Sequence, residues 1–93
     1  MKYKILIEPS AVKDLNSIYN FIEKNDSKTK AKNFLSKLQK QIKTLNQMPQ
    51  IYRDSYYLKD GKTKDLIYKG YTICYHINSN RVHILSVFRQ KNY

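Results

Sequence analysis

Apolar residues recur along this chain at two spacings, one typical of strands and one typical of helices. Residues 3–8, YKILIE, are rich in β-branched and aromatic side chains and stop at Pro9, which predicts a first strand. From 11 to 24 the apolar positions follow a helical period and form one stripe. These positions are Ala11, Leu15, Ile18, Tyr19 and Ile22. Ser10 is expected to cap this helix.

A second helix is predicted from about 28 to 46. Its apolar stripe consists of Ala31, Phe34, Leu35, Leu38, Ile42 and Leu45. The break before it, Asn25-Asp26-Ser27, is short and supplies an N-cap, so the two helices should pack as an antiparallel hairpin. Met48-Pro49 should end the second helix, because the residue before a proline avoids helical geometry.

Three strands are expected after an irregular segment at 50–63. They cover 63–69, 71–77 and 81–88, and the turns between them contain Gly70 and Asn78-Ser79-Asn80. Connections this short predict an antiparallel meander. We therefore predict one α+β domain over residues 1–93, in the order β-α-α-β-β-β, with a helix hairpin packed on a small antiparallel sheet.

The last predicted strand is apolar on both faces. Strict alternation places Val82, Ile84 and Phe88 on one face, and Leu85 and Val87 on the other. Since one layer of helices covers only one face of a sheet, we expect Leu85 and Val87 to present apolar surface to a partner.

Charge adds a second expectation about partners. The chain has 18 Lys+Arg against 7 Asp+Glu, a net charge of +11, which predicts attraction to a polyanion or to an acidic protein. Six of these charges lie on the second helix, and no acidic residue occurs between Asp26 and Asp54. The six are Lys28, Lys30, Lys32, Lys37, Lys40 and Lys43. They form either a solvated face or a docking surface.

Few residues in the chain have the chemistry of a catalytic or metal site. Cys74 is the single cysteine and is expected to be a small apolar residue within a strand. His76 and His83 are the only histidines, and without clustered cysteines they argue against a metal site. No glycine-rich phosphate loop is present, and we expect no cofactor. The N-terminal apolar stretch is too short for a signal peptide or a membrane span, so a cytoplasmic protein without membrane contact is expected.

Three segments of the chain together resemble the RelE/ParE toxin superfamily, and its ParE-like branch in particular. The segments are AVKDLNSIYNFI after the first strand, AKNFLSKLQKQIKTLNQMP, and DLIYKGYTICYHINSNRVHILSVFRQKNY. The resemblance covers nearly the whole chain except residues 50–63. It implies a bacterial type II toxin that is held inactive by a cognate antitoxin. ParE-like members inhibit DNA gyrase, whereas RelE-like and YoeB-like members share the fold and cut mRNA on the ribosome.

The residues favour the gyrase-inhibiting branch. The ribonuclease branch usually has an arginine where this chain has Thr72, and the C-terminal histidine of YoeB-like tails is missing. RNA cleavage needs a base, a cation at the phosphate and an acid. If the chain is a ribonuclease, the candidates are Lys64, Arg81, Arg89, Lys91 and Tyr93. The alternative therefore remains an mRNA endonuclease acting with the ribosome, and a plain nucleic-acid-binding module is a third possibility.

The resemblance also suggests how the partners bind. In ParE-like proteins the last strand and tail are implicated in toxicity, so Arg89, Lys91 and Tyr93 are the predicted target-binding residues, and arginine and tyrosine are favoured anchors in interfaces. Antitoxin C-termini in this superfamily fold on binding. For the antitoxin we predict contacts with Leu85, Val87, Lys30, Lys37 and Lys40, although the lysines could equally dock nucleic acid.

Overall fold

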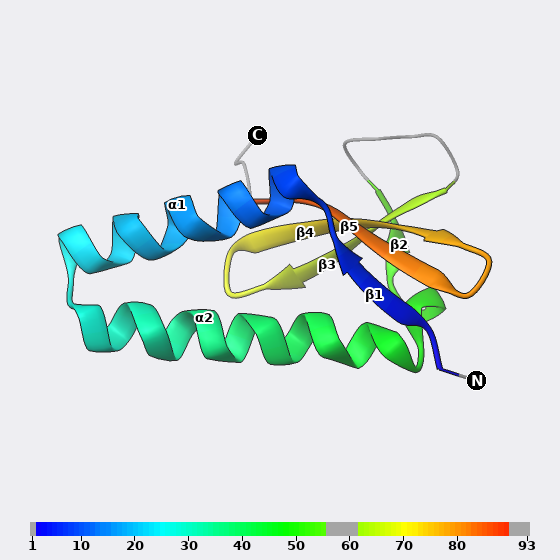
Figure 1. Ribbon diagram of the computed structural model, residues 1–93, viewed down its shortest axis with the longest axis horizontal. Helices are drawn as coiled ribbons and strands as arrows, with labels where there is room; N and C mark the ends of the chain where they lie inside the picture. Colours follow the sequence, from blue (N-terminus) through cyan, green and yellow to red (C-terminus); the bar gives the residue numbers. More distant parts are fainter. Residues whose placement is uncertain (1, 56–61, 90–93) are drawn as a thin grey trace.

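The computed structural model describes residues 2–55 and 62–89. Within them the elements are β1 (Lys4–Ile7), α1 (Pro9–Asn25), α2 (Lys28–Lys43), the 3-10 turns η1 (Thr44–Asn46) and η2 (Pro49–Ile51), β2 (Arg53–Asp54), β3 (Thr63–Tyr68), β4 (Tyr71–Asn78) and β5 (Arg81–Arg89) (Figure 1). The two long helices lie antiparallel, and their hairpin packs on the sheet (Figure 1). The predicted α+β fold with a helix hairpin is confirmed.

The sheet is mixed rather than wholly antiparallel. Its strand order is β1-β5-β4-β3-β2. The last three long strands form the predicted antiparallel meander, but β1 lies parallel to β5, with Lys4 opposite Arg81. A parallel pair needs a long crossover, and the helix hairpin together with the meander supplies it. The short strand β2 lies in the segment 50–63 that was expected to be irregular, and it pairs with Lys64 and Asp65 of β3. The sequence did not predict it, because two residues carry no periodic signal.

The two helices begin in different ways. α1 starts at Pro9, in the position where a missing N–H costs nothing, and Glu8 before it makes no side-chain cap. Ser10 is therefore not the cap that the sequence suggested. Its hydroxyl instead donates to the Leu85 carbonyl at 2.6 Å. α2 begins as predicted, because the Ser27 hydroxyl accepts the Lys30 N–H at 3.1 Å.

The core lies between the helix stripes and one face of the sheet. It is built from Ala11, Leu15, Ile18, Leu38, Ile42 and Leu45, and on the sheet from Leu66, Ile73, Tyr75, Val82, Ile84 and Val87. Tyr75 is completely buried, and its hydroxyl donates to the Pro49 carbonyl. Burial raises the pKa of the Tyr75 phenol, because the charged form would have to leave water. No helix in the described part of the chain is long and apolar enough to span a membrane.

A β-bulge changes which residues of β5 face the helices. Ile84 pairs with Tyr75 and Ser86 pairs with Cys74, so Leu85 is an extra residue without a partner on β4. The bulge reverses the alternation beyond it. Val87 therefore enters the core, where only 2% of its surface is exposed, and the prediction that it faces a partner is wrong. Phe88, opposite Thr72, lies on the face away from the helices rather than beside Ile84.

Candidate functional site

The end of β5 is held in place by two polar side chains of α1. β1 ends opposite Ile84, so beyond that point β5 has no neighbouring strand on one side. Ser10 bonds the carbonyl of Leu85 there, and the N–H of Val87 donates to Asp14 Oδ2 at 2.9 Å. Ser10 and Asp14 are four residues apart and therefore share one face of α1. The start of α1 thus replaces the missing strand and fixes the position of the C-terminal half of β5.

A shallow apolar hollow adjoins this end of the strand. It has a volume of about 420 Å³ and is lined by Ser17, Ile18, Phe21, Tyr71 and Arg89. Phe21 is 54% exposed, although it is a large apolar residue. A hollow with an aromatic wall and a guanidinium suits an apolar side chain that has a carboxylate nearby. Phe21 was not among the predicted site residues. Its signal in the sequence is an apolar residue of α1 that lies beside the core stripe and not within it.

Of the predicted target-binding residues, only Arg89 falls within the described part of the chain. It is the last residue of β5, it is exposed, and it pairs with Tyr71 at the start of β4. Lys91 and Tyr93 lie outside the described residues. The structure therefore places one predicted contact beside the apolar hollow.

The described candidates for a ribonuclease site do not converge. Arg81 and Arg89 occupy the two ends of β5, opposite Asn78 and Tyr71 of β4, and because the bulge adds one residue their separation is roughly 24 Å at the usual rise of a strand. Lys64 on β3 is largely covered, and its Nζ lies 3.0 Å from Asp54 Oδ1. No single phosphate can contact these three cations together.

A carboxylate occupies the middle of the sheet face opposite the helices. The Asp65 side chain is fully buried, with Arg53 Nη2 at 3.6 Å, and the Cys74 thiol donates to Asp65 Oδ1 at 3.2 Å. Burial and then this hydrogen bond raise the pKa of Cys74 to about 12, so the thiol is not a nucleophile at neutral pH. Thr72 nearby is also fully buried. The carboxylate is buried and paired with Arg53, so the middle of this face offers no free base for cleavage of RNA.

The two histidines are cross-strand neighbours. His76 and His83 lie directly opposite each other, with ring centroids 5.8 Å apart. His83 Nδ1 is 3.9 Å from Glu8 Oε2, a distance for a weak ion pair when the ring is protonated. Among the residues that the structure describes, no three histidine, cysteine or acidic side chains gather in a way that could hold a metal ion.

The six lysines of α2 all lie on its solvent face. Every one is exposed, and the buried residues Ala31, Leu38 and Ile42 define the opposite side of the helix. The predicted contacts Lys30, Lys37 and Lys40 therefore belong to one surface, whereas Leu85 is half-buried at the bulge of β5. The first turn of α2 has no acidic residue. Cations at the positive end of a helix dipole are unfavourable by about 0.3–1 kcal/mol each at low ionic strength.

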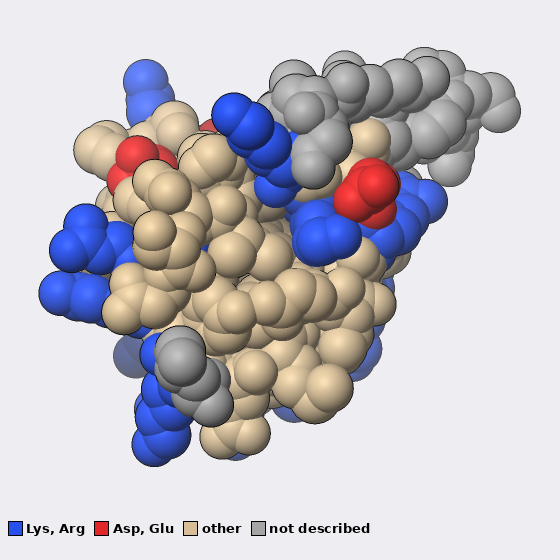
Figure 2. Space-filling view, turned by 90° about the vertical axis from the view of Figure 1, so that its right-hand side faces the viewer, with Lys and Arg blue, Asp and Glu red and all other residues tan. Residues whose placement is uncertain are grey.

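Charge at one end of the molecule is more dispersed. Figure 2 shows the end of the molecule that faces right in Figure 1, where lysines and arginines surround a broad uncharged surface and acidic groups interrupt them. This end has no continuous basic patch. The lysines of α2 therefore form a denser set of cations than this end of the molecule does.

Comparison with known proteins places this chain in a toxin family. The family model described as ParE toxin of type II toxin-antitoxin system, parDE, matches residues 5–92. No curated protein matches the chain significantly.

Three solved structures share its fold. In the chromosomal ParDE toxin-antitoxin system from P. aeruginosa, the matched chain is 16% identical with a TM-score of 0.84, covering 97% of this chain and 98% of that one. The toxin-antitoxin complex RelBE2 from Mycobacterium tuberculosis gives 16% identity and a TM-score of 0.72, with 97% and 100% covered. The YoeB dimer from Staphylococcus aureus gives 18% identity and a TM-score of 0.58, with 100% of this chain and 100% of that chain covered. At these identities the likeness concerns the fold alone.

Proposed function

The chain belongs to the ParE toxin family of type II toxin-antitoxin systems, and from that premise we propose that it inhibits DNA gyrase without cutting RNA, and that a cognate antitoxin neutralises it. The family membership gives the toxin class. The choice of gyrase over ribosome-bound mRNA is our inference from the residues of this chain.

The separation of Arg81 from Arg89 is the observation that carries this choice. Cleavage through the 2′-hydroxyl requires a base, a cation and an acid around one phosphate. In this chain the two arginines end opposite ends of β5, and Lys64 is paired with Asp54. Asp65, on the same sheet, is fully buried and paired with Arg53, so it is not available as the base. This arrangement favours recognition of a protein surface over catalysis on RNA.

The proposed contact with gyrase is the end of β5 together with the tail. Arg89 offers an exposed guanidinium at the rim of the apolar hollow, and α1 fixes the strand that carries it. Lys91 and Tyr93 follow directly and would extend the same contact surface. Rigid placement of an arginine beside an aromatic wall is typical of interface anchors.

The antitoxin is proposed to bind the apolar surface of α1 and the bulge of β5. Phe21 and Val12 are exposed apolar residues of α1, and Leu85 is half-buried at the bulge. An acidic segment that folds on binding could cover them. Lys30 and Lys37, with Lys40 beside them, would attract that segment over distance and speed its capture without direct apolar contact. Two of the solved relatives are toxin-antitoxin systems by description, in agreement with this partner class.

Matched arginine variants test the proposal. Arg89→Ala should weaken inhibition of gyrase supercoiling by purified chain, whereas Arg81→Ala, at the other end of the same strand, should leave it unchanged. Wild-type chain added to a translating extract should leave ribosome-bound mRNA intact. Cut mRNA with normal supercoiling would assign the chain to the ribonuclease branch instead. Tight nucleic-acid binding with neither effect would indicate a plain binding module.

A further inference from the structure

The solvent face of α2 has a composition that suits one kind of ligand. It presents six ammonium groups between Lys28 and Lys43, together with short hydroxyl and amide side chains. The large apolar residues that are exposed elsewhere in the described chain do not occur on α2. A partner on this face gains charge contacts and hydrogen bonds but no apolar burial. That is the balance of a phosphate backbone and not of an amphipathic protein segment.

The helix dipole does not account for these lysines. Lys40 and Lys43 lie in the last turn, where a cation is favoured. Lys28 and Lys30, in the first turn, face the positive end of the dipole instead, and only Lys30 has an acidic neighbour, Asp26 at 3.2 Å. Repulsion along the face is therefore present in the free chain. A bound polyanion would relieve it at both ends of the helix.

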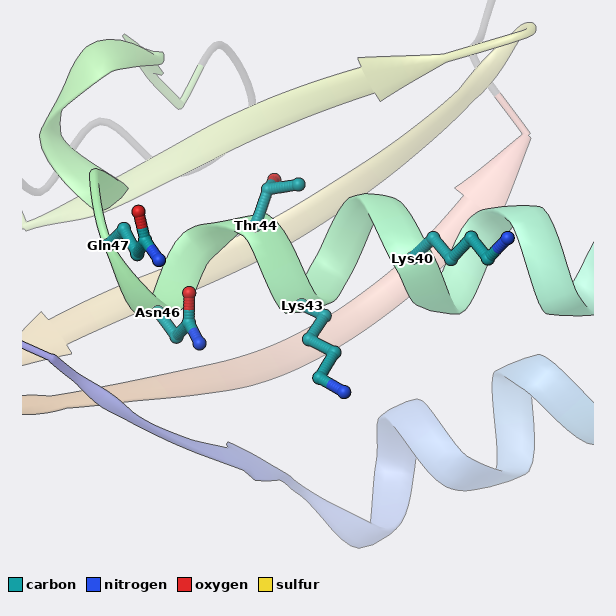
Figure 3. A pocket seen from close by; sticks show the side chains of 5 residues that line it. All are labelled: Lys40, Lys43, Thr44, Asn46 and Gln47. Atoms are coloured by element: carbon teal, nitrogen blue, oxygen red, sulfur yellow. The ribbon is translucent and has the colours of Figure 1, made fainter.

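A hollow lined by residues with polar end groups continues this face beyond the last turn of α2. It has a volume of about 340 Å³ and is lined by Lys40, Lys43, Thr44, Asn46 and Gln47 (Figure 3). Lys43 and Asn46 project from the same side of the chain, and Thr44 points to the other side, where its hydroxyl donates to the Gln41 carbonyl (Figure 3). The remaining donors are two ammonium groups and two carboxamides. No carboxylate lines the hollow, so it can accept a phosphate group.

We propose that the lysine face of α2 and this hollow bind the phosphate backbone of duplex DNA without reading its sequence. Single strands are usually held by aromatic stacking, and α2 exposes no aromatic residue, so a duplex is favoured. The choice of DNA over duplex RNA rests on the proposed gyrase target, an enzyme that holds DNA. From Lys28 to Lys43 the helix extends about 22 Å, against a phosphate every 3.4 Å along each strand of a duplex.

The salt dependence of DNA binding tests this directly. The chain is titrated into a labelled duplex of about 20 base pairs and arbitrary sequence, between about 50 and 200 mM salt, with anisotropy as the signal. Each lost phosphate contact should make the negative slope of log affinity against log salt shallower by about 0.9. For the triple variant Lys37→Gln, Lys40→Gln, Lys43→Gln the slope should be shallower by about 2.7, so wild-type affinity should drop about 40-fold more over this range than variant affinity does.

A matched variant separates the face from net charge. The triple variant Lys13→Gln, Lys24→Gln, Lys69→Gln removes an equal number of charges, from exposed positions outside α2. Its slope should stay within about one unit of the wild-type slope. Thermal melts of both variants should show a folded protein, since all six side chains are exposed. Equal slopes for the two variants would overturn the proposal.

Two competitors test the identity of the ligand. A polyglutamate peptide of equal charge should displace the duplex only in large excess, and displacement at equal charge would identify an acidic protein as the occupant. Tighter binding of an RNA duplex than of the DNA duplex would overturn the choice of DNA. Because gyrase is absent from all these measurements, their outcome is independent of whether the chain inhibits that enzyme.

Discussion

Removing the carboxylate of Asp14 should loosen the end of β5 and destabilise the whole chain. Asp14 Oδ2 accepts the Val87 N–H at 2.9 Å, and Val87 is 2% exposed. In Asp14→Ala this buried donor has no acceptor, so we expect a loss of about 1.5–3 kcal/mol, the range for a hydrogen bond to a charged group. For a domain of this size, 2 kcal/mol corresponds to a fall in Tm of about 8–16 °C.

Two further variants separate the hydrogen bond from the charge. Asp14→Asn retains an acceptor oxygen and should lose about half as much stability as the alanine variant. Asp26→Ala removes an exposed carboxylate paired with Lys30, and it should cost no more than about 0.5 kcal/mol. Urea unfolding at neutral pH measures all three values.

Hydrogen exchange locates the effect. In Asp14→Ala the Val87 amide should exchange faster than amides in the middle of β4, because its bond partner is gone and the strand end opens locally. If Asp14→Ala is as stable as Asp26→Ala and the Val87 amide stays protected, the role assigned to α1 at the bulge is wrong.

Four other changes follow from the same structure. Tyr75→Phe should cost about 1–3 kcal/mol in urea unfolding, because the buried carbonyl of Pro49 loses its donor. Native Cys74 should resist thiol reagents at pH 8 and react only on unfolding, and fast labelling of the native protein would contradict this. Because the pKa of Cys74 is raised to about 12 in the folded chain, the unfolded chain loses this proton first. The free energy of unfolding should therefore fall by about 1.4 kcal/mol per pH unit above about pH 9, relative to Cys74→Ala. Phe21→Ser should weaken antitoxin binding at least tenfold in calorimetry without loss of thermal stability, because more than half of the ring is exposed. Deleting residues 89–93 should abolish toxicity on expression, and full toxicity would remove the tail from the proposed target site.

Periodicity predicted the two helices and the meander because both signals are local. The stripe through Leu15 and Ile18 is buried, as is the stripe through Leu38 and Ile42. The helical positions depend only on the spacing of neighbours along the chain. The Ser27 cap was predictable for the same reason, since the hydroxyl and the Lys30 N–H are three residues apart.

The bulge at Leu85 could not be predicted from alternation. β5 is bonded there by Ser10 and Asp14, more than seventy residues earlier in the sequence, and such a contact leaves no periodic signal. With the bulge, Val87 lies in the core and not on the predicted partner surface. The parallel pairing of β1 with β5 is equally non-local, and the residue pattern of neither strand indicates it.

The candidate site was predicted in part. The lysines of α2 share one face because helical spacing determines which residues align. The distance from Arg81 to Arg89 also follows once β5 is known to be one continuous strand. The hollow beside Phe21 depends on how α1 packs against the start of β4, which the pattern of either element alone does not specify.

Parallel labelling of DNA and protein synthesis after induced expression tests the central claim most directly. The account predicts that incorporation of labelled thymidine falls first, while incorporation of labelled methionine continues and mRNA remains uncut. An early stop in methionine incorporation, with cleaved mRNA and continuing DNA synthesis, would contradict it.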